Sequence, residues 1–239
     1  MKMFAGGPEP TLPPSISVVI PVLHESGGIN RLLAHLTRLP CAGNLEIIVV
    51  DGAPSAETIE AIRDPRVRKV RSGRGRGIQM NAGAREASGD ILLFLHADTR
   101  LPPSGPADIA RAMRSSSAVG GAFSLSIDSR CPCYRVIETT ATLRSRITRV
   151  PYGDQAIFIR RGYFLRIGGF AAFPILEDVE LMRRIKKTGE RIVLLSPRVR
   201  TSARRWERTG IFRNTLRNWL ILILFRMGVP AERLDRFYR

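Results

Sequence analysis

Mostly apolar segments of strand length alternate with segments of helical periodicity in the first hundred residues, and this alternation constrains the fold most strongly. Residues 16–22, 45–50 and 91–95 are rich in Val, Ile and Leu, which is typical of strands buried on both faces. Residues 29–36 instead place apolar side chains at helical spacing. The pattern predicts an α/β fold with a mostly parallel, Rossmann-like central sheet flanked by helices.

The second half of the sequence continues with less regular segments of the same kinds. Further strands are expected at 67–71, 118–127, 155–160 and 191–195, and helices at 77–87, 133–149 and 177–188, with Ser55 capping a short helix. From residue 209 the pattern is helical to the end, with breaks at Gly228 and Pro230.

These segments predict one domain with two appendages. We expect a flexible arm at 1–14, an α/β domain at 15–206 and a basic, apolar helical tail at 207–239. The arm has no apolar run and does not resemble a signal peptide. The longest apolar run, 219–225, is far shorter than the roughly 20 residues that span a bilayer. The expected location is cytoplasmic, with association with the inner face of the membrane as a further option.

The composition adds a strong positive charge. Lys and Arg number 38 against 21 Asp and Glu, a formal net charge of +17, which favours an anionic partner or reflects Arg as the default surface residue. The three cysteines are too few for a disulfide framework, and their number suits a reducing compartment. Cys131 and Cys133 lack a second Cys or His pair at zinc-site spacing, so a structural role is expected.

Polar residues that follow the predicted strands are the first candidates for chemistry, because ligands of parallel sheets bind at the carboxyl ends of strands. Asp51 ends the second strand and could accept hydrogen bonds from a nucleotide, or could simply form an Asp-Gly turn. Residues 72–77 form a Gly/Arg loop before a helix, where Arg74 and Arg76 could hold phosphate, although an exposed loop would look the same.

Two further groups carry carboxylates. Asp98 and His96 follow the fully apolar strand, and Asp98 suits Mg²⁺ or Mn²⁺ while His96 favours Mn²⁺; a turn-forming Asp is the alternative. Glu177 and Asp178 begin a helix, where acids are favoured by the helix dipole alone. One of the two could still act as a general base on an acceptor hydroxyl.

Taken together, the motifs resemble the family 2 glycosyltransferases of the GT-A fold. Residues 18–25 resemble the family's VIPxxNE start, 49–52 its VVDDGS segment and 77–83 its G…NxG helix. Residues 93–98 stand where the family has FLDADD, and 168–178 resemble GGF…EDxDL. A bacterial stand-alone subgroup with HADT, YGDQ and ARRW signatures is most similar, through residues 96–99, 152–155 and 203–206.

The resemblance implies transfer of a sugar from a nucleotide-sugar donor to an acceptor hydroxyl with inversion. It assigns the donor site to Pro21, Glu25, Asp51, Arg74, Arg76, Asn81, Asp98 and Arg205, the divalent metal (Mn²⁺ or Mg²⁺) to Asp98 with His96, and the catalytic base to Asp178. Asp154, Gln155, Glu177 and Trp206 are the implied acceptor-side residues, with Asp154 an alternative base.

Some residues depart from the family pattern. His96 replaces the first Asp of the metal motif, which puts the identity of the metal in doubt, and Ser202 replaces the Gln of the processive QxxRW pattern, which disfavours repeated transfer. In the tail, Arg residues flank 219–225, which suits a helix lying on an anionic membrane with a lipid-linked acceptor, or equally packing onto the domain or a second subunit.

Two other classes of function remain open. A nucleotidyltransferase could use a similar α/β scaffold, but no Gly-rich loop follows the first strand. The charge of +17 also suits a nucleic-acid-binding protein, but aromatic residues are only 7% and no nucleic-acid-binding motif is present, so no nucleic-acid partner is expected.

Overall fold

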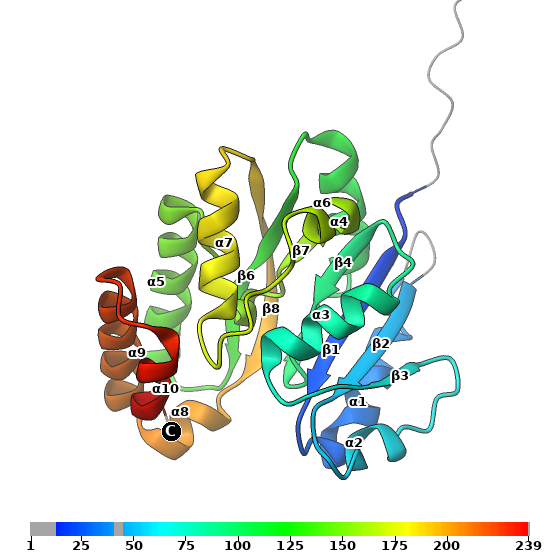
Figure 1. Ribbon diagram of the computed structural model, residues 1–239, viewed down its shortest axis with the longest axis horizontal. Coiled ribbons are helices and arrows are strands. Elements are labelled where there is room, and N and C mark those ends of the chain that lie inside the picture. Colours follow the sequence, from blue (N-terminus) through cyan, green and yellow to red (C-terminus); the bar gives the residue numbers. More distant parts are fainter. Residues whose placement is uncertain (1–12, 41–44, 239) are drawn as a thin grey trace, which may run out of the picture.

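The computed structural model describes residues 13–40 and 45–238, and its centre is an eight-stranded sheet (Figure 1). The strand order is β3-β2-β1-β4-β7-β6-β8-β5. The four strands from β3 to β4 are parallel, β7 is antiparallel to both of its neighbours, and β6 and β8 are parallel to each other. The mostly parallel α/β sheet predicted from the sequence is therefore confirmed.

The elements alternate along the chain as the apolar pattern predicts. The strands are β1 (Ile16–Val22), β2 (Leu45–Asp51), β3 (Arg68–Arg71), β4 (Ile91–Phe94), β5 (Thr99–Arg100), β6 (Gly120–Asp128), β7 (Phe158–Arg160) and β8 (Ile192–Ser202). The helices are α1 (Ser26–Leu36), α2 (Glu57–Glu60), α3 (Arg76–Glu86), α4 (Gly105–Ser115), α5 (Cys133–Thr148), the 3₁₀ turn η1 (Gly153–Gln155), α6 (Arg161–Arg166), α7 (Glu177–Lys187), α8 (Arg204–Thr209), α9 (Ile211–Arg226) and α10 (Ala231–Tyr238).

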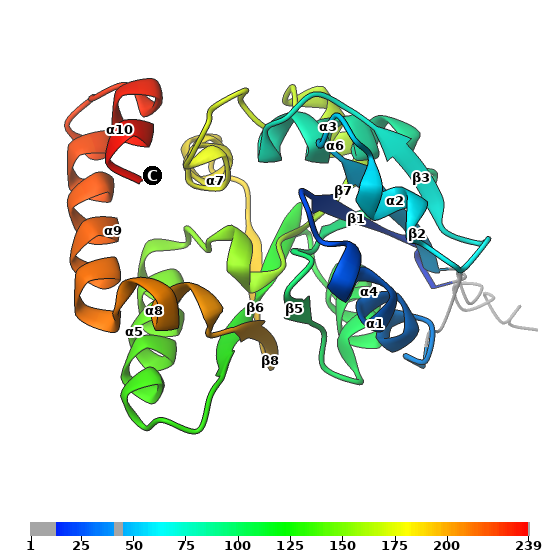
Figure 2. The same ribbon diagram turned by 90° about the horizontal axis from the view of Figure 1, so that it is seen from below.

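The sheet is buried on both faces, which explains its continuous apolar strands. On β1, Val18 and Ile20 pack into a cluster with α1, α2 and α4, whereas Val19 packs into a second cluster with α3, α6 and α7. Successive side chains of a strand point to opposite faces, so both sets must be apolar. Figure 2 shows α3, α6 and α7 on one side of the sheet and α1 and α4 on the other.

Several elements differ from the sequence-based prediction. The expected strand at 155–160 shortens to β7, because Gly153–Gln155 form a 3₁₀ turn before it. The expected strand at 191–195 extends to Ser202, because a register shift after Phe123 lets β8 follow β6 to its end. Helix α4 was not predicted, since its Gly105-Pro106 start has the composition of a loop.

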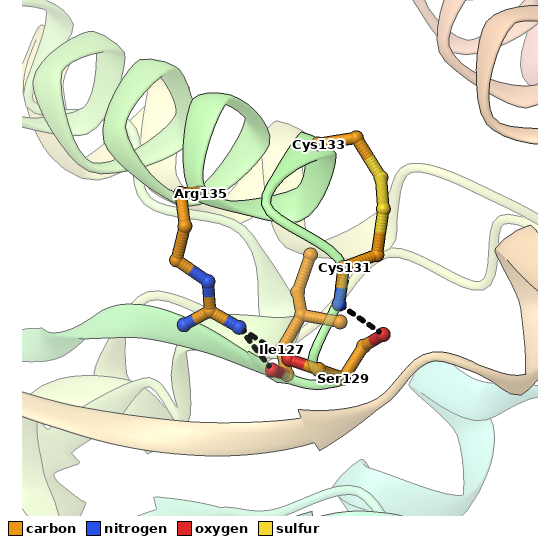
Figure 3. Close-up of a disulfide and its surroundings, with 5 residues drawn as sticks. All are labelled: Ile127, Ser129, Cys131, Cys133 and Arg135. Carbon is orange, nitrogen blue, oxygen red and sulfur yellow. Dashed lines mark hydrogen bonds between the residues drawn. A yellow bond between two sulfur atoms is a disulfide. The ribbon is translucent and has the colours of Figure 1, made fainter.

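The structure joins Cys131 and Cys133 in a disulfide just before and at the start of α5 (Figure 3). Their Cα atoms are 5.4 Å apart, within the usual range for a disulfide. One bond between two cysteines separated by a single proline is not the disulfide framework that the cysteine count argues against. Arg135 closes the same turn by donating to the carbonyl oxygens of Ile127 and Ser129 at 3.1 and 2.7 Å.

The C-terminal helices lie at the end of the sheet beyond α5 and α7 (Figures 1 and 2). Ile221 of α9 and Leu234 of α10 are buried against Ile175, which precedes α7. The opposite face of α9 is exposed, so the tail both packs onto the domain and leaves an apolar surface open. Within residues 13–40 and 45–238, no helix is long and apolar enough to cross a membrane. Of the predicted arm at 1–14, the first twelve residues lie outside the described part of the chain.

Helix α3 approaches the sheet closely only because residue 83 is glycine. A Cβ atom there would collide with the side chains of Val19 and Val50, which are fully buried. We predict that Gly83→Ala lowers the free energy of unfolding by about 1–3 kcal/mol, because an overpacked core must shift to accommodate the methyl group. Urea denaturation measures the change.

The matched control is Gly27→Ala in α1, where an added Cβ has no neighbour within 4 Å. Alanine is the better helix former there, so stability should stay equal or rise by up to about 1 kcal/mol. Equal stability of the Gly83 and Gly27 variants would contradict the close packing of α3.

Candidate functional site

Three loops of the candidate site leave the same edge of the sheet. Strands β2, β1 and β4 are neighbours and run parallel, so their carboxyl ends lie together. Half-buried Pro21 lies in β1 opposite Val50, and Glu25 follows β1. Asp51 ends β2, and Asp98 follows β4. The sheet therefore brings residues from three distant parts of the sequence to one rim.

Asp51 is buried, and its carboxylate holds the start of α2. Its Oδ2 accepts hydrogen bonds from the backbone N–H groups of Thr58 and Ile59 at 3.1 and 3.3 Å. The helix begins after Ala56 with no side-chain cap, so the prediction of Ser55 as its N-cap is wrong. The capping acceptor comes instead from the end of β2. The Asp51 carboxylate therefore has a structural role, at the position to which the resemblance assigns the nucleotide.

A second set of contacts joins Glu25 and Asp98 to the end of β8. The N–H of Ser202 donates to the Asp98 carbonyl oxygen at 3.1 Å, and Arg204 lies 3.8 Å from a Glu25 carboxylate oxygen. The Asp98 side chain is exposed. In α8, Trp206 packs edge-on against Tyr134, with ring centroids 6.2 Å apart. The side chain of Arg205 lies outside the described part of the structure.

His96, Gly153 and Asp178 meet at one point. The N–H of Gly153 donates to Asp178 Oδ2 at 2.5 Å. A Cβ atom placed on Gly153 would lie 3.1 Å from His96 Nε2 and 3.2 Å from Asp178 Oδ2. The imidazole after β4 and the carboxylate at the start of α7 therefore both approach residue 153 closely, which the absence of a side chain there allows.

The residues that flank Gly153 differ in exposure. Gln155 is buried, and its amide holds the fold together: Nε2 donates to the Phe123 carbonyl oxygen at 3.0 Å, and Oε1 accepts from Ser145 Oγ at 2.6 Å. Asp154 is half-buried. Gln155 thus attaches the η1 turn to the core, and the turn places Gly153 next to the start of α7.

The Gly/Arg loop leads directly into α3. Gly75 caps this helix with φ +136°, a conformation that favours glycine. A Cβ on Gly77 would lie 2.7 Å from the Ala171 carbonyl oxygen, so glycine also allows α3 to approach the segment before α7. Arg76 then lies 3.6 Å from a Glu177 carboxylate oxygen, whereas Arg74 is exposed.

Glu177 is a buried acid beside the candidate base. Burial, together with the neighbouring charge of Asp178, raises its pKa from 4.5 to about 7, and Arg76 partly opposes both effects. Before it, Leu176 has φ +63°, in the left-handed region that Leu rarely adopts. The start of α7 is therefore an unusual local structure: a strained residue, a buried acid and a half-buried acid in succession.

Asn81 links α3 to the same region. Its Nδ2 donates to the Phe170 carbonyl oxygen at 2.8 Å, and its Oδ1 accepts from the Phe170 N–H at 2.9 Å. The ring of Phe170 packs on Phe94 and Phe164. Asn81 thus anchors the Gly168–Phe170 segment to the strand that leads to His96.

Sequence reasoning missed two residues that shape the site. Gln79 is buried and donates to the carbonyl oxygens of Val22 and Val50 at 2.7 and 2.9 Å, which joins the ends of β1 and β2. Its place on the inner face of α3, one turn before Gly83, was an available signal. Arg144 of α5 stacks on Tyr152 at 3.1 Å, and nothing in its sequence context indicates this.

The residues after β4 fit a cation that is shared with a bound diphosphate. No group of three or more His, Cys, Asp or Glu side chains able to hold a metal occurs among the described residues. Mg²⁺ and Mn²⁺ are often held by one or two carboxylates, with substrate phosphates and water completing the coordination. Exposed Asp98 together with His96 fits that arrangement, and does not fit a cation held by protein alone.

The comparisons with known proteins agree with the fold and with the family that the motifs resemble. A model of the family described as Glycosyl transferase family 2 matches residues 17–175. The protein also resembles the solved mannosyltransferase PcManGT from Pyrobaculum calidifontis in complex with GDP-Man and Mn²⁺, with a TM-score of 0.60 and 24% identity over 83% of this chain and 60% of that one. The architecture is that of GT-A glycosyltransferases.

Curated relatives match over part of their length. An uncharacterized glycosyltransferase of Mycobacterium tuberculosis is 31% identical over 114 residues, 46% of this chain and 43% of that protein. An undecaprenyl-phosphate 4-deoxy-4-formamido-L-arabinose transferase of Aeromonas hydrophila is 30% identical over 118 residues, 44% of this chain and 36% of that protein. The matched region therefore spans less than half of either relative.

The raised pKa of Glu177 predicts a pH-dependent cost to stability. Below its ordinary pKa of 4.5 the carboxyl is protonated in both folded and unfolded chains. As the pH rises from 4.5 to about 7, only the unfolded chain loses the proton, so folding loses stability. The glutamine of Glu177→Gln does not titrate. Over this pH range, the free energy of unfolding of the variant should therefore rise relative to that of the natural protein by up to about 3 kcal/mol.

Urea denaturation of both proteins at pH 4.5, 6 and 8 measures this difference. The effects of titrating groups that do not interact with Glu177 cancel in the comparison, because the two proteins share those groups. A stability difference that stays constant with pH would contradict the buried, protonated state of Glu177.

Proposed function

Because the chain belongs to glycosyl transferase family 2, we propose that it transfers a sugar from a nucleotide-sugar donor to an acceptor hydroxyl. The observation that carries this proposal is the convergence of His96, Gly153 and Asp178 at one rim of the sheet. Arg76 and Glu177 lie directly beside them. Basic, acidic and imidazole groups meet there, as a displacement of a diphosphate leaving group requires.

The donor occupies the carboxyl ends of β1, β2 and β4. In this proposal the nucleoside lies along Pro21, Glu25 and Asp51, and the diphosphate lies toward Arg74 and Arg76 at the N-terminus of α3. Arg205 is also assigned to the diphosphate, and Asn81 to the support of this region. Helix N-termini and arginines both favour phosphate, which supports this orientation.

A divalent cation, Mn²⁺ or Mg²⁺, belongs to the same proposal. Asp98 would hold it, with His96 as a second ligand. When bound, such a cation neutralises charge on the leaving diphosphate. The complex of PcManGT with GDP-Man and Mn²⁺ supports the pairing of a nucleotide sugar with a metal in this fold.

Asp178 is the proposed general base. The Gly153 N–H and the Val179 N–H, at 2.5 and 2.7 Å, fix the direction of its carboxylate. Asp178 takes the proton of the acceptor hydroxyl, the hydroxyl oxygen bonds to the anomeric carbon, and the bond to the nucleoside diphosphate breaks on the opposite side. A single displacement of this kind inverts the anomeric centre.

The acceptor approaches from the side of η1 and α8. Asp154, Glu177 and Trp206 are the proposed residues there, with Gln155 acting through the position of η1. We propose single rather than repeated transfer, because Ser202 stands where the processive pattern has Gln, and its Oγ accepts from Arg204 at 3.2 Å. The proposal includes membership of the stand-alone subgroup, because the chain carries the HADT, YGDQ and ARRW segments.

The tail supports a peripheral membrane contact. Leu216, Trp219, Leu220, Ile223 and Met227 are 50–76% exposed and recur at helical spacing, so they form one stripe along α9. Exposed Arg213 and Arg226 flank the stripe on opposite sides. An apolar stripe edged by cations suits a helix lying on an anionic bilayer.

Removing the charge of Asp178 tests the proposed base. We predict that Asp178→Asn lowers the transfer rate at least about 100-fold, since the acceptor proton loses its destination, while donor affinity changes little. Steady-state kinetics and nucleotide-sugar binding measure the two effects. Asp64→Asn, on the loop after α2, is the matched control and should keep normal turnover. Unchanged turnover of Asp178→Asn would refute the assignment.

A thermal-shift panel tests the donor and the metal. We predict that one nucleotide sugar, with Mn²⁺, raises the melting temperature by about 5–10 °C at 100 times its Kd, because the ligand binds only the folded chain. Asp98→Ala should remove the part of the shift that needs Mn²⁺, and Asp64→Ala should not. A flat response of the natural protein to every nucleotide sugar would refute the proposed function.

A further inference from the structure

A basic pocket adjoins the site described above, shares Arg144 and Tyr152 with it, and lies between α5, α7 and α9. Its volume is about 370 Å³. Figures 1 and 2 show α9 beyond α5 and α7 at one end of the sheet. Five of the side chains that line it are cationic: Arg144, Arg183, Lys186, Lys187 and Arg226. No carboxylate lines it in the described part of the chain, so the pocket fits an anion.

Among the five cations, Arg144 has a donor group that lacks a hydrogen-bond acceptor in the described part of the chain. Its Nη1 is buried and has no hydrogen-bond partner. A buried guanidinium donor without a partner is costly, so a ligand acceptor would relieve it. Burial lowers the pKa of Arg144 to about 10, opposed by the nearby charges of Asp154 and Asp178. By contrast, Arg184 on the other face of α7 is bonded to Glu180 and to the Ile167 and Gly169 carbonyl oxygens.

The same pocket has an apolar wall on α9. Leu222 and Phe225 line it, and Arg183 lies 5.7 Å from the Phe225 ring. Arg226 lines the pocket and also borders the exposed stripe of α9 that contains Trp219. The cations, the apolar wall and the outer stripe are therefore continuous, which suits a ligand with a phosphate at one end and a hydrocarbon chain at the other.

The pocket begins beside the proposed base. Val179, the residue after Asp178, lines it. Along a helix that rises 1.5 Å per residue, Arg183 lies about 7 Å and Lys187 about 13 Å beyond Asp178. A phosphate among these cations would therefore lie on the order of 10 Å along the helix from a hydroxyl at Asp178.

We propose that this pocket binds the phosphate of a lipid-linked acceptor, whose hydrocarbon chain passes Leu222 and Phe225 toward a bilayer on which α9 lies. This inference rests on the proposed function, because it names the class of acceptor for that site. The phosphate anchors the acceptor, and the hydroxyl that reacts belongs to the group attached beyond it.

Calorimetric titration of the full chain with octyl phosphate, octanol and inorganic phosphate tests the pocket. Octyl phosphate should bind at least about tenfold more tightly than either fragment, since it uses both the cations and the apolar wall. Arg183→Ala/Lys187→Ala should weaken octyl phosphate about tenfold or more, and Arg183→Lys should weaken it much less, because the charge remains. Arg114→Ala, an exposed arginine on α4, is the matched control.

Each other outcome would overturn the inference. Equal binding of octyl phosphate and inorganic phosphate would identify a site for free phosphate. Normal binding by the double variant would place the ligand elsewhere. Flotation with vesicles containing a long-chain alkyl phosphate distinguishes membrane contact by α9 from binding of the phosphate in the pocket. Trp219→Ser should weaken flotation but should not weaken octyl phosphate binding. The nucleotide-sugar thermal shift of the natural protein judges the proposed function separately, since it does not involve this pocket.

Discussion

The hydrogen bond from the Gly153 N–H to Asp178 holds the candidate site together, because it joins parts of the chain that no strand pairing connects directly. The buried amide of Gln155 attaches the turn that contains Gly153 to the core. Asp178 lies at the start of α7, which packs on the sheet. His96 comes to the same place on the strand next to β1. Any side chain at residue 153 would enter the space between imidazole and carboxylate, so the geometry depends on the missing Cβ.

Two kinds of electrostatic environment lie on either side of α7. Toward α3, Glu177 is enclosed and faces Arg76, so a negative charge there is costly and is partly balanced. Toward α5 and α9, cations gather with no acid among the described residues that line the pocket. Asp178 stands where the two meet. The candidate base therefore lies between a buried acid and a set of cations.

The sequence was sufficient for the parallel half of the sheet and for the residues at its rim. Continuous apolar runs identify β1, β2 and β4, and the same-edge rule then places Glu25, Asp51 and Asp98 together. The antiparallel insertion of β7 was not predictable, because three residues carry no periodicity. The hydrogen bonds that Asp51 accepts from α2 depend on the path of the backbone after β2. The pocket around Arg144 depends on how α9 folds back, which local pattern does not encode.

Leu176 packs against the C-terminal tail and lies two residues before the candidate base, Asp178. It sits in the left-handed region, where glycine would be cheaper, and its side chain packs with Ile175 against Ile221 and Leu234 of the last two helices. Contacts made by the tail therefore offset the backbone strain just before Glu177 and Asp178. Displacing the tail would remove these contacts and leave the strain of Leu176 without the packing that offsets it, two residues before Asp178.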